Sequence, residues 1–422
     1  MKERSGPYLI ILMLWLLVFA AASQIMIIAL ILPRIAEELT VDKSVLGLLM
    51  TIYAVSVGVF ALIAGPISDR FGRRRILFIG AGLLAATLGL HGFADTFAEL
   101  LVMRGLAGVA GGILSGAAVS YVGDYFPVHR RGWASGWVMS GIAAGQIMGV
   151  PLGTLLADWL GFRAPFLAFA VVAALAFFLI LFLLPQPDVK SSTSLSVRSA
   201  LKSYSALLER KEVRAAAAAF VAMFMGFSLF VTFFSTWLEE HLDFSPHMVV
   251  ILFIVGGAAN VLVGPQAGKL SDRIGRTGVI IAASIGIALL MPVTTLVQPS
   301  FYWAIYPLFF LIMAFFASRM SPMQALMTEL ATGAQRGALM SLVTSVGQLG
   351  FGLGSAIASA VWGRFGFTGN ALLGMVSVLL MGVIVWRFLR PVELGLIAAK
   401  NGESEVGTEA ETTTVPALTR NL

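Results

Sequence analysis

The amino-acid sequence predicts an all-α membrane protein in which 12 transmembrane helices form two pseudo-symmetric six-helix bundles. Three observations predict this fold. The chain is 58% hydrophobic and only 12% charged, long apolar runs recur along it, and residue patterns of the first half return in the second. A soluble chain of this length carries about twice that charged fraction. A lipid bilayer is therefore the expected solvent.

The apolar runs are long enough to cross a bilayer, which takes about 20 helical residues. Most are bounded by charges or by proline. The first run is too long for a secretory signal peptide, although Lys2 and Arg4 precede it. The predicted spans are 8–32, 45–67, 76–95, 99–122, 134–158, 164–185, 214–239, 247–268, 278–297, 301–326, 337–361 and 370–389.

The distribution of basic residues predicts the orientation of the chain. Of the 28 Lys and Arg residues, 22 fall in the N-terminus, the loops after even-numbered spans and the C-terminus, and only four fall in the other loops. Basic loops stay in the cytoplasm, so both termini are expected there, in the plasma membrane, which would be the inner membrane of a bacterium. The same distribution speaks against nucleic acid as a partner. The absence of cysteine excludes disulfides and Cys-ligated metals.

One long polar insert divides the chain into two halves. We expect an N-terminal bundle at 1–184, a cytoplasmic linker at 185–213, a C-terminal bundle at 214–390 and a disordered tail at 391–422. Within the linker, apolar residues recur at helical spacing among basic ones, which predicts a helix on the membrane surface. A flexible linker without structure is the alternative. The apolar positions are Val197, Leu201, Tyr204 and Leu208.

The two halves repeat each other in register. The segment from Ala64 to Arg73 returns at an offset of 203, and the segment from Arg131 to Phe162 returns at an offset of 205. Two similar bundles that rock about a site between them are what alternating access requires. The repeat therefore predicts a transporter rather than an enzyme. No P-loop, Ser-His-Asp set or metal cluster is visible, and no cofactor is expected.

The loop after the second span carries the most specific motif. The segment Gly65–Arg75 resembles the G-x-x-x-D-R-x-G-R-R signature of the major facilitator superfamily, and it is echoed in the second half. The resemblance implies the major facilitator fold and a gate on the cytoplasmic side. The gate residues are Gly65, Asp69, Arg70, Gly72, Arg73, Arg74 and Asp124, with Gly268, Asp272, Arg273, Gly275 and Arg276 in the second half.

The gate has a simple electrostatic interpretation. A carboxylate at Asp69 can cap the positive N-terminus of a helix from the other half, and the family pattern implies that this is span eleven, which begins near Arg336. Asp124 is placed to pair with Arg73 or Arg74. These contacts would hold the cytoplasmic side shut.

Spans four and five carry two further resemblances. Arg104 and Gly108 are similar to the R-x-x-x-G element of the family, although Arg104 could also reach the outer membrane surface. Glycines four residues apart in span five permit close helix packing, and a proline bends the helix. This segment resembles the glycine-rich motif of the export branch, in the variant of the arabinose-efflux and drug:proton antiporter group. Its residues are Gly141, Gly145, Gly149, Pro151 and Gly153.

The polar and aromatic side chains within the spans are the candidates for a substrate cavity. Polar groups are costly in lipid, so they are expected to face the interior. Interhelical hydrogen bonds are the alternative role for the amides, and ordinary packing is the alternative for the aromatic stripe of span seven. The candidates are Gln24, Tyr53, Arg104, Gln146, Phe230, Trp237, Asn260, Arg319 and Gln348.

The predicted function is proton-coupled export of a small amphipathic or polar compound by a monomer. Protons are the expected coupling ion, but no carboxylate lies near the middle of any predicted span. The candidate proton carriers are therefore Asp124, Asp158 and Glu99, working with Arg104, and His91 is a weaker candidate. A uniporter or exchanger of an organic anion that uses Arg104 and Arg319 is the main alternative. Lipid flipping and a non-transporting receptor are the others.

Overall fold

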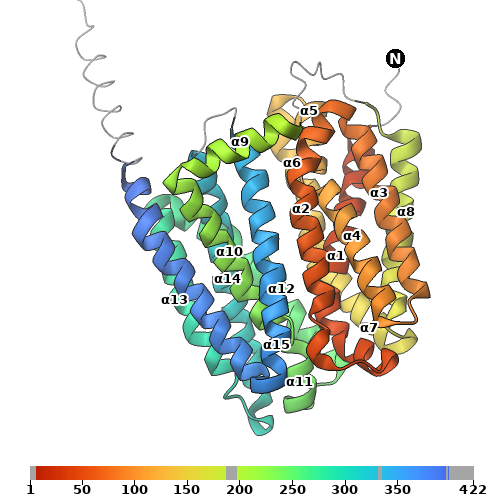
Figure 1. Cartoon of the computed structure of the whole chain (residues 1–422), viewed down its shortest axis with the longest axis vertical. Helices are drawn as coiled ribbons and strands as arrows, with labels where there is room; N and C mark the ends of the chain where they lie inside the picture. The colour runs from red at the N-terminus through yellow and green to blue at the C-terminus, as the bar shows by residue number, and fades with distance from the viewer. Residues whose placement is uncertain (1–5, 187–196, 331–334, 396–397, 399–422) are drawn as a thin grey trace, which may run out of the picture.

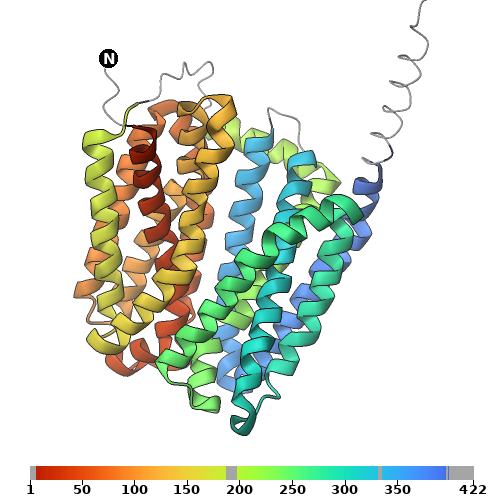
Figure 2. The same cartoon turned by 180° about the vertical axis from the view of Figure 1, so that it is seen from behind.

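The computed structural model describes residues 6–186, 197–330, 335–395 and 398, and these residues form two helical bundles that stand side by side (Figures 1 and 2). Within this part of the chain, 11 helical stretches are long and apolar enough to cross a membrane. The last of them, Gly337–Gly395, is 59 residues long. It contains two spans, because Gly366 breaks the helix with a φ of 59° and a ψ of −157°. The described spans therefore match the predicted 12.

Each bundle contains helices that the sequence predicted as single spans but that the structure breaks. Span four is interrupted at Gly116, which has a φ of 74°, and span seven is interrupted at Thr232 and Phe233. The N-terminal helices are α1 (Pro7–Leu39), α2 (Leu48–Phe71), α3 (Arg73–Leu90), α4 (Phe97–Leu114), α5 (Ala117–Tyr125), α6 (Val128–Ala144), α7 (Val150–Leu160) and α8 (Arg163–Leu183). The others are α9 (Val197–Glu209), α10 (Lys211–Val231), α11 (Phe234–Leu242), α12 (Pro246–Ile274), α13 (Arg276–Thr294), α14 (Ile305–Leu330) and α15 (Arg336–Ile384).

The sequence repeat is also a repeat of backbone conformation. Gly72 and Gly275, which correspond at an offset of 203, have φ and ψ of 92° and 139°, and of 96° and 140°. Gly161 and Gly366, which correspond at an offset of 205, both have positive φ, at 87° and 59°. Residues with a Cβ rarely adopt this region. The repeated glycines therefore mark the same sharp turn between consecutive spans in each bundle.

Two ends of the molecule can be distinguished by the chain segments that they carry. We call the end with the start of α1, the helix α9 and the end of the last span the terminal face, and the other end the opposite face (Figure 1). The predicted linker helix is present as α9, and it lies along the terminal face. The hydroxyl of Tyr204 in α9 donates a hydrogen bond to the carbonyl of Leu62 in α2 at 2.9 Å. The linker helix is thus attached to the N-terminal bundle.

The last span extends beyond the predicted end of the C-terminal bundle at residue 390. Residues 391–395 remain helical, and the Glu393 side chain is buried. Its carboxylate accepts hydrogen bonds from the backbone N–H groups of Arg276 and Thr277, at 2.5 and 2.9 Å, at the start of α13. A carboxylate at this position satisfies donors that a helix N-terminus leaves free. Nearly all of the predicted disordered tail lies outside the described residues.

The glycines of span five bring that span close to α1. A Cβ atom at Gly141 would lie 2.9 Å from the Trp15 carbonyl oxygen, and one at Gly149 would lie 2.0 Å from the Ser23 hydroxyl. Gly145 and Gly153 face the same helix. In the C-terminal bundle, Gly350 packs equally closely on α10. Helix contact through glycine is therefore a shared feature of the two bundles.

Replacing Gly350 with alanine is expected to destabilise the C-terminal bundle. The new Cβ would lie 2.5 Å from the carbonyl oxygen and 2.8 Å from the Cα of Val221, and these backbone atoms cannot move without shifting α10. Overpacking of this kind costs about 1–3 kcal/mol. The apparent unfolding temperature in detergent, followed by tryptophan fluorescence, should fall. Gly136→Ala is the control because a Cβ there meets nothing within 4 Å, and equal stability of the two variants would contradict this account.

Candidate substrate site between the bundles

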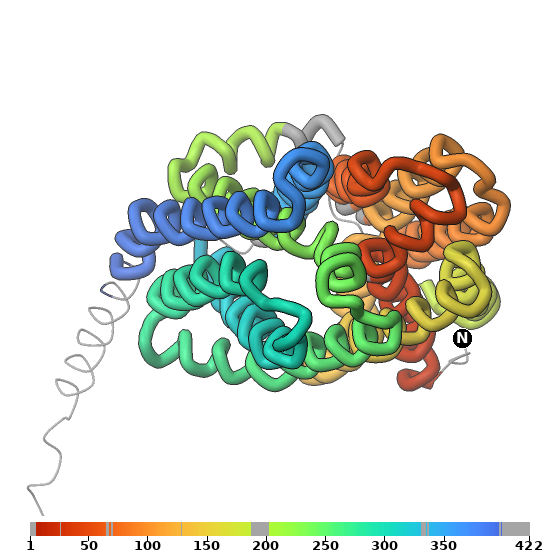
Figure 3. The backbone as a smooth tube through the Cα atoms, turned by 90° about the horizontal axis from the view of Figure 1, so that it is seen from below, coloured from red at the N-terminus to blue at the C-terminus, as the bar shows by residue number. Residues whose placement is uncertain are grey.

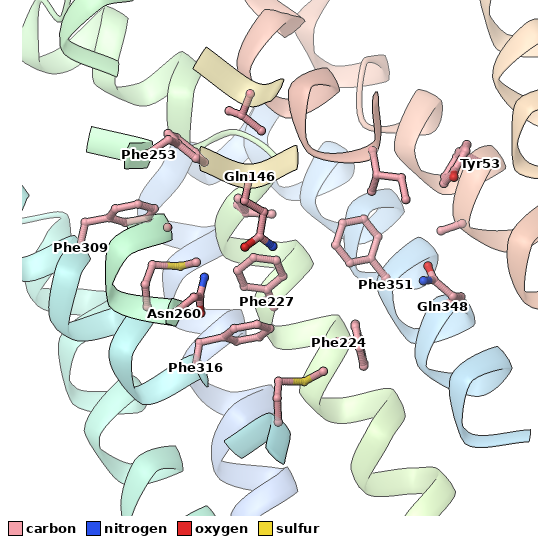
Figure 4. A pocket seen from close by; sticks show the side chains of 17 residues that line it. Tyr53, Gln146, Phe224, Phe227, Phe253, Asn260, Phe309, Phe316, Gln348 and Phe351 are labelled. Carbon is pink, nitrogen blue, oxygen red and sulfur yellow. The ribbon is translucent and has the colours of Figure 1, made fainter. Parts of the chain in front are cut away.

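A cavity of about 200 Å³ lies between the two bundles (Figure 4). Both bundles contribute to its wall, which is mostly aromatic and aliphatic and has few polar groups. Such a wall suits an apolar ligand with a small number of polar contacts. The lining residues are Ile25, Tyr53, Ala54, Gln146, Val150, Phe224, Phe227, Val231, Phe253, Gly257, Asn260, Phe309, Met313, Phe316, Met320, Gln348 and Phe351.

Four of the predicted cavity residues line this cavity. They are Tyr53, Gln146, Asn260 and Gln348. Gln146 lies in a π-helical turn, Gly145–Gly149, that joins α6 to α7. Such turns insert an extra residue into a helix and often occur at functional sites. In Figure 4, the amides of Gln146 and Asn260 lie near the rings of Phe227 and Phe316.

Sequence reasoning missed most of the aromatic wall. Phe309, Met313, Phe316 and Met320 follow one another at helical spacing along α14, and all four line the cavity. That spacing identifies one face of a helix. It does not distinguish a cavity face from a face packed against another helix, so only the spacing was visible in the sequence.

Phe230 and Trp237 lie elsewhere. Both are buried, and neither is among the residues that line the cavity. The ring of Phe230 packs at 5.0 Å from that of Phe234, and the ring of Trp237 stacks at 4.8 Å from that of Phe367. The structure therefore places these two residues in an aromatic core within the C-terminal bundle, toward the opposite face.

Gln24 and Arg104 form a buried polar cluster with Tyr53. Arg104 Nη1 donates to Gln24 Oε1 at 2.6 Å, and Gln24 Nε2 donates to the Tyr53 hydroxyl at 2.9 Å. The guanidinium carbon of Arg104 also lies 4.4 Å from the centre of the Tyr53 ring. Arg104 is fully buried and is not part of the cavity wall, whereas Tyr53 is. This arginine therefore contacts a tyrosine of the cavity wall and does not itself line the cavity.

Replacing Gln24 with leucine is expected to destabilise the N-terminal bundle more than Tyr53→Phe does. The first change removes a hydrogen bond to a buried cation, which contributes about 1.5–3 kcal/mol, whereas the second removes a neutral hydrogen bond of about 0.5–1.5 kcal/mol and keeps the aromatic ring. Thermal unfolding of the two purified variants in detergent measures both stabilities. The reverse order of stabilities would show that the cluster does not depend on Gln24.

Arg319 has a different environment from Arg104. Its side chain is fully buried, and its guanidinium carbon lies 5.3 Å from the centre of the Phe316 ring. Nη1 lies 3.6 Å from the thioether sulfur of Met381, which is a weak acceptor. Nε and Nη2 have no hydrogen-bond partner among the described residues. The C-terminal bundle thus contains a cation without a strong acceptor.

The predicted gate region contains two matching ion pairs at the terminal face. Arg73 Nε donates to Asp124 Oδ2 at 2.8 Å, and Arg276 Nη1 lies 2.5 Å from Glu329 Oε2. Asp124 and Glu329 correspond at the offset of 205. The Glu329 pair was missed because the segment around it does not otherwise repeat. Arg74 donates to the carbonyl of Leu181 at 2.7 Å.

The remaining gate residues are only partly described. The side chains of Asp69, Arg70 and Arg336 lie outside the described residues, so the predicted cap on span eleven does too. Asp272 lies 3.8 Å from Arg276, within the same motif. Arg273 is exposed, and Gly268 packs near Ser321 of α14.

Direct polar contacts between the bundles lie from mid-depth to the opposite face in the part of the chain that is described. Lys43 forms an ion pair with Glu240. The Ser355 hydroxyl donates to the Gly47 carbonyl at 2.7 Å, and the Thr51 hydroxyl donates to the Gly352 carbonyl at 3.0 Å. Seen from the opposite face, α11 lies beside α1 (Figure 3). The structure therefore shows a conformation in which the bundles are joined at the opposite face.

Each predicted proton carrier has a local partner. Asp124 pairs with Arg73 as described above. Asp158 accepts from Arg34 at 2.8 Å. The Glu99 carboxylate accepts from the backbone N–H groups of Asp95 and Thr96, at 2.9 and 3.2 Å, and so caps the start of α4.

A further acidic residue, Glu239, lies in α11 of the C-terminal bundle and was not selected from the sequence. Its side chain is half-buried, and it interacts electrostatically with Arg34, Glu37 and Asp158 of the other bundle. The predicted seventh span ended at this residue. In the structure, the Glu239 carboxylate lies at the contact between the bundles.

Comparison with known proteins agrees with this architecture. The model of the Major Facilitator Superfamily matches residues 14–310 and 216–420. The crystal structure of a D-xylose–proton symporter matches with a TM-score of 0.74 and 18% identity, over 91% of this chain and 98% of that one. At this identity the match shows the fold alone.

Among curated proteins, the chain is similar to several that are named multidrug resistance proteins. Multidrug resistance protein MdtG of Proteus mirabilis (strain HI4320) is 28% identical over 365 residues, which is 84% of this chain and 89% of the relative. The protein of the same name from Salmonella typhi is 27% identical over 396 residues, which is 90% of this chain and 96% of the relative.

The fold and the central cavity define a multi-pass secondary transporter of the membrane. The chain belongs to the Major Facilitator Superfamily. The predicted family and fold are thereby confirmed, and the protein is a transporter and not an enzyme.

Proposed function

We propose that this protein exports aromatic, amphipathic small molecules in exchange for protons, with its terminal face in the cytoplasm. The observation that carries the proposal is the cavity, because both bundles build its wall and aromatic side chains dominate it. Relative motion of the bundles changes access to such a site. The names of the MdtG relatives and the glycine motif of span five support export of drug-like compounds.

The cluster around Arg34 is the best candidate for proton coupling. One guanidinium faces three carboxylates, those of Glu37, Asp158 and Glu239, so two negative charges are left uncompensated when all three are ionised. A carboxylate near other carboxylates binds a proton more readily. Glu239 comes from the other bundle, so opening of the opposite face would carry it away from Arg34. Protonation of this cluster would therefore depend on the conformation of the transporter.

Transport by reconstituted protein tests this function. Vesicles that contain a pH indicator and a fluorescent aromatic dye should show dye movement driven by an imposed pH gradient, and addition of dye should move protons in the opposite direction. Glu239→Gln should weaken the coupling, whereas Asp243→Asn, at an exposed residue that ends the same helix, should not. Dye transport that neither needs a gradient nor moves protons would overturn proton coupling. Failure of folded protein to transport any aromatic compound would overturn the proposed function itself.

A further inference from the structure

Arg319 is a fully buried cation without an anionic partner among the described residues. Among the side chains and backbone that the structure describes, its Nη1 has the Met381 sulfur as acceptor, and its Nε and Nη2 have none. Arg104, the other arginine that is buried among the described residues, has the side-chain carbonyl of Gln24 and the face of Tyr53, and only its Nε lacks a partner there. Buried charges are normally paired, because an unpaired one loses its hydration without replacement. Arg104 therefore has an oxygen acceptor for its guanidinium, whereas Arg319 has only a thioether sulfur among the described residues.

The free atoms of Arg319 form one binding edge. Nε and Nη2 point to the same side of the planar guanidinium, and this pair can donate two parallel hydrogen bonds to one carboxylate. Nη1, on another edge, is the atom near Met381. The unused edge is thus the one that recognises a carboxylate, sulfonate or phosphate group side-on.

Arg319 belongs to a helix that lines the cavity. Phe316 and Met320, which flank Arg319 on α14, both line the cavity wall. The Phe316 ring lies 5.3 Å from the guanidinium carbon, and it stacks on the ring of Phe227, another lining residue, at a centroid distance of 4.3 Å. The guanidinium therefore lies against a ring that belongs to the cavity wall. The long arginine stem can carry its charged end past that ring by rotamer changes.

We propose that Arg319 is the anion-binding group of the substrate site, so that the preferred substrates are aromatic amphiphiles with one negatively charged group. The aromatic wall would hold the ring system, and the guanidinium would hold the anionic group. Asn260 and Gln146 also line the cavity, and their amide N–H groups could donate hydrogen bonds to the remaining lone pairs of the anionic group. This inference rests on the proposed export function and specifies its substrate class.

A matched pair of probes tests the inference. Pyrenebutyrate and its neutral amide share one aromatic system and differ in charge. Wild-type protein in detergent should bind the carboxylate about tenfold more tightly than the amide, since a bidentate charge-assisted pair is among the stronger hydrogen-bonding arrangements. Reconstituted protein should also transport the carboxylate faster than the amide. Equal affinity for the two probes in wild-type protein would overturn the inference without any variant.

Variants of Arg319 separate a binding role from a structural one. Arg319→Met should lose the preference for the carboxylate probe and retain binding of the amide. It should unfold at a temperature no lower than wild type, because no acceptor in the described structure would lose a strong hydrogen bond. Arg319→Lys should keep part of the preference, because lysine has charge but no bidentate edge. Retained preference in folded Arg319→Met would overturn the inference while the export function stands. Failure of wild-type protein to bind or transport either probe would overturn both.

Discussion

A short bifunctional thiol crosslink between Lys43→Cys and Glu240→Cys is expected to reduce transport to the level of protein-free vesicles. The two side chains form an ion pair between the bundles at the opposite face. The ion pair itself is half-exposed and contributes little energy. A covalent link would instead prevent the bundles from separating there, and alternating access needs that separation. Because the chain contains no cysteine, no other thiol would react.

A second pair at the same face supplies the control. Asp95 and Arg163 form an ion pair at 3.1 Å, and both belong to the N-terminal bundle. The double variant Asp95→Cys/Arg163→Cys should crosslink with the same reagent and keep transporting. Uptake of the aromatic dye before and after crosslinking measures the transport activity of both double variants. Full activity of the crosslinked Lys43→Cys/Glu240→Cys protein would show that the opposite face does not open during transport.

Filling the central cavity with Gly257→Phe is expected to abolish substrate binding while the protein remains folded. Gly257 lines the cavity, and a Cβ there would lie 3.1 Å from Ile147 Cγ1. A phenyl ring at this position would occupy much of a cavity of about 200 Å³. The added ring would pack against mostly apolar side chains, so its burial would not destabilise the protein through loss of hydration. Binding of the dye, followed by fluorescence, should therefore fall below detection.

Leu262→Phe is the matched control, because it adds a phenyl ring to the same helix at a position that is 60% exposed and outside the cavity lining. This variant should bind the dye as wild type does. Thermal unfolding of both variants shows whether the fold is kept. Normal binding by folded Gly257→Phe would place the substrate elsewhere and remove the main support for the proposed site.

Much of the fold was predictable because the bilayer imposes strong rules on local sequence. Apolar runs of sufficient length must form helices in lipid, since their backbone groups have no other partners there. The offset repeat predicted two equivalent bundles, and the paired conformations of Gly72 and Gly275 agree with it. Helix breaks within spans, such as the one at Gly116, were not predicted, because an apolar run does not show where a helix is interrupted.

The candidate site was predictable only in part, for a physical reason. Polar residues in lipid must face the interior, so Tyr53, Gln146, Asn260 and Gln348 could be selected by type, and all four line the cavity. Aromatic side chains pack favourably against lipid, against another helix or in a cavity wall. Their type therefore did not separate Phe316, in the cavity wall, from Trp237, in the core.

The sequence by itself determined the membrane class, the two repeated bundles and the family, because these follow from composition, run length and motif spacing. Only the tertiary structure decided which charges meet. Glu239 lies beside Arg34, Glu329 pairs with Arg276, and Arg319 remains without an anion in the described structure. The reason is that electrostatic partnership depends on distance between helices that are far apart in the chain, and no local pattern encodes that distance.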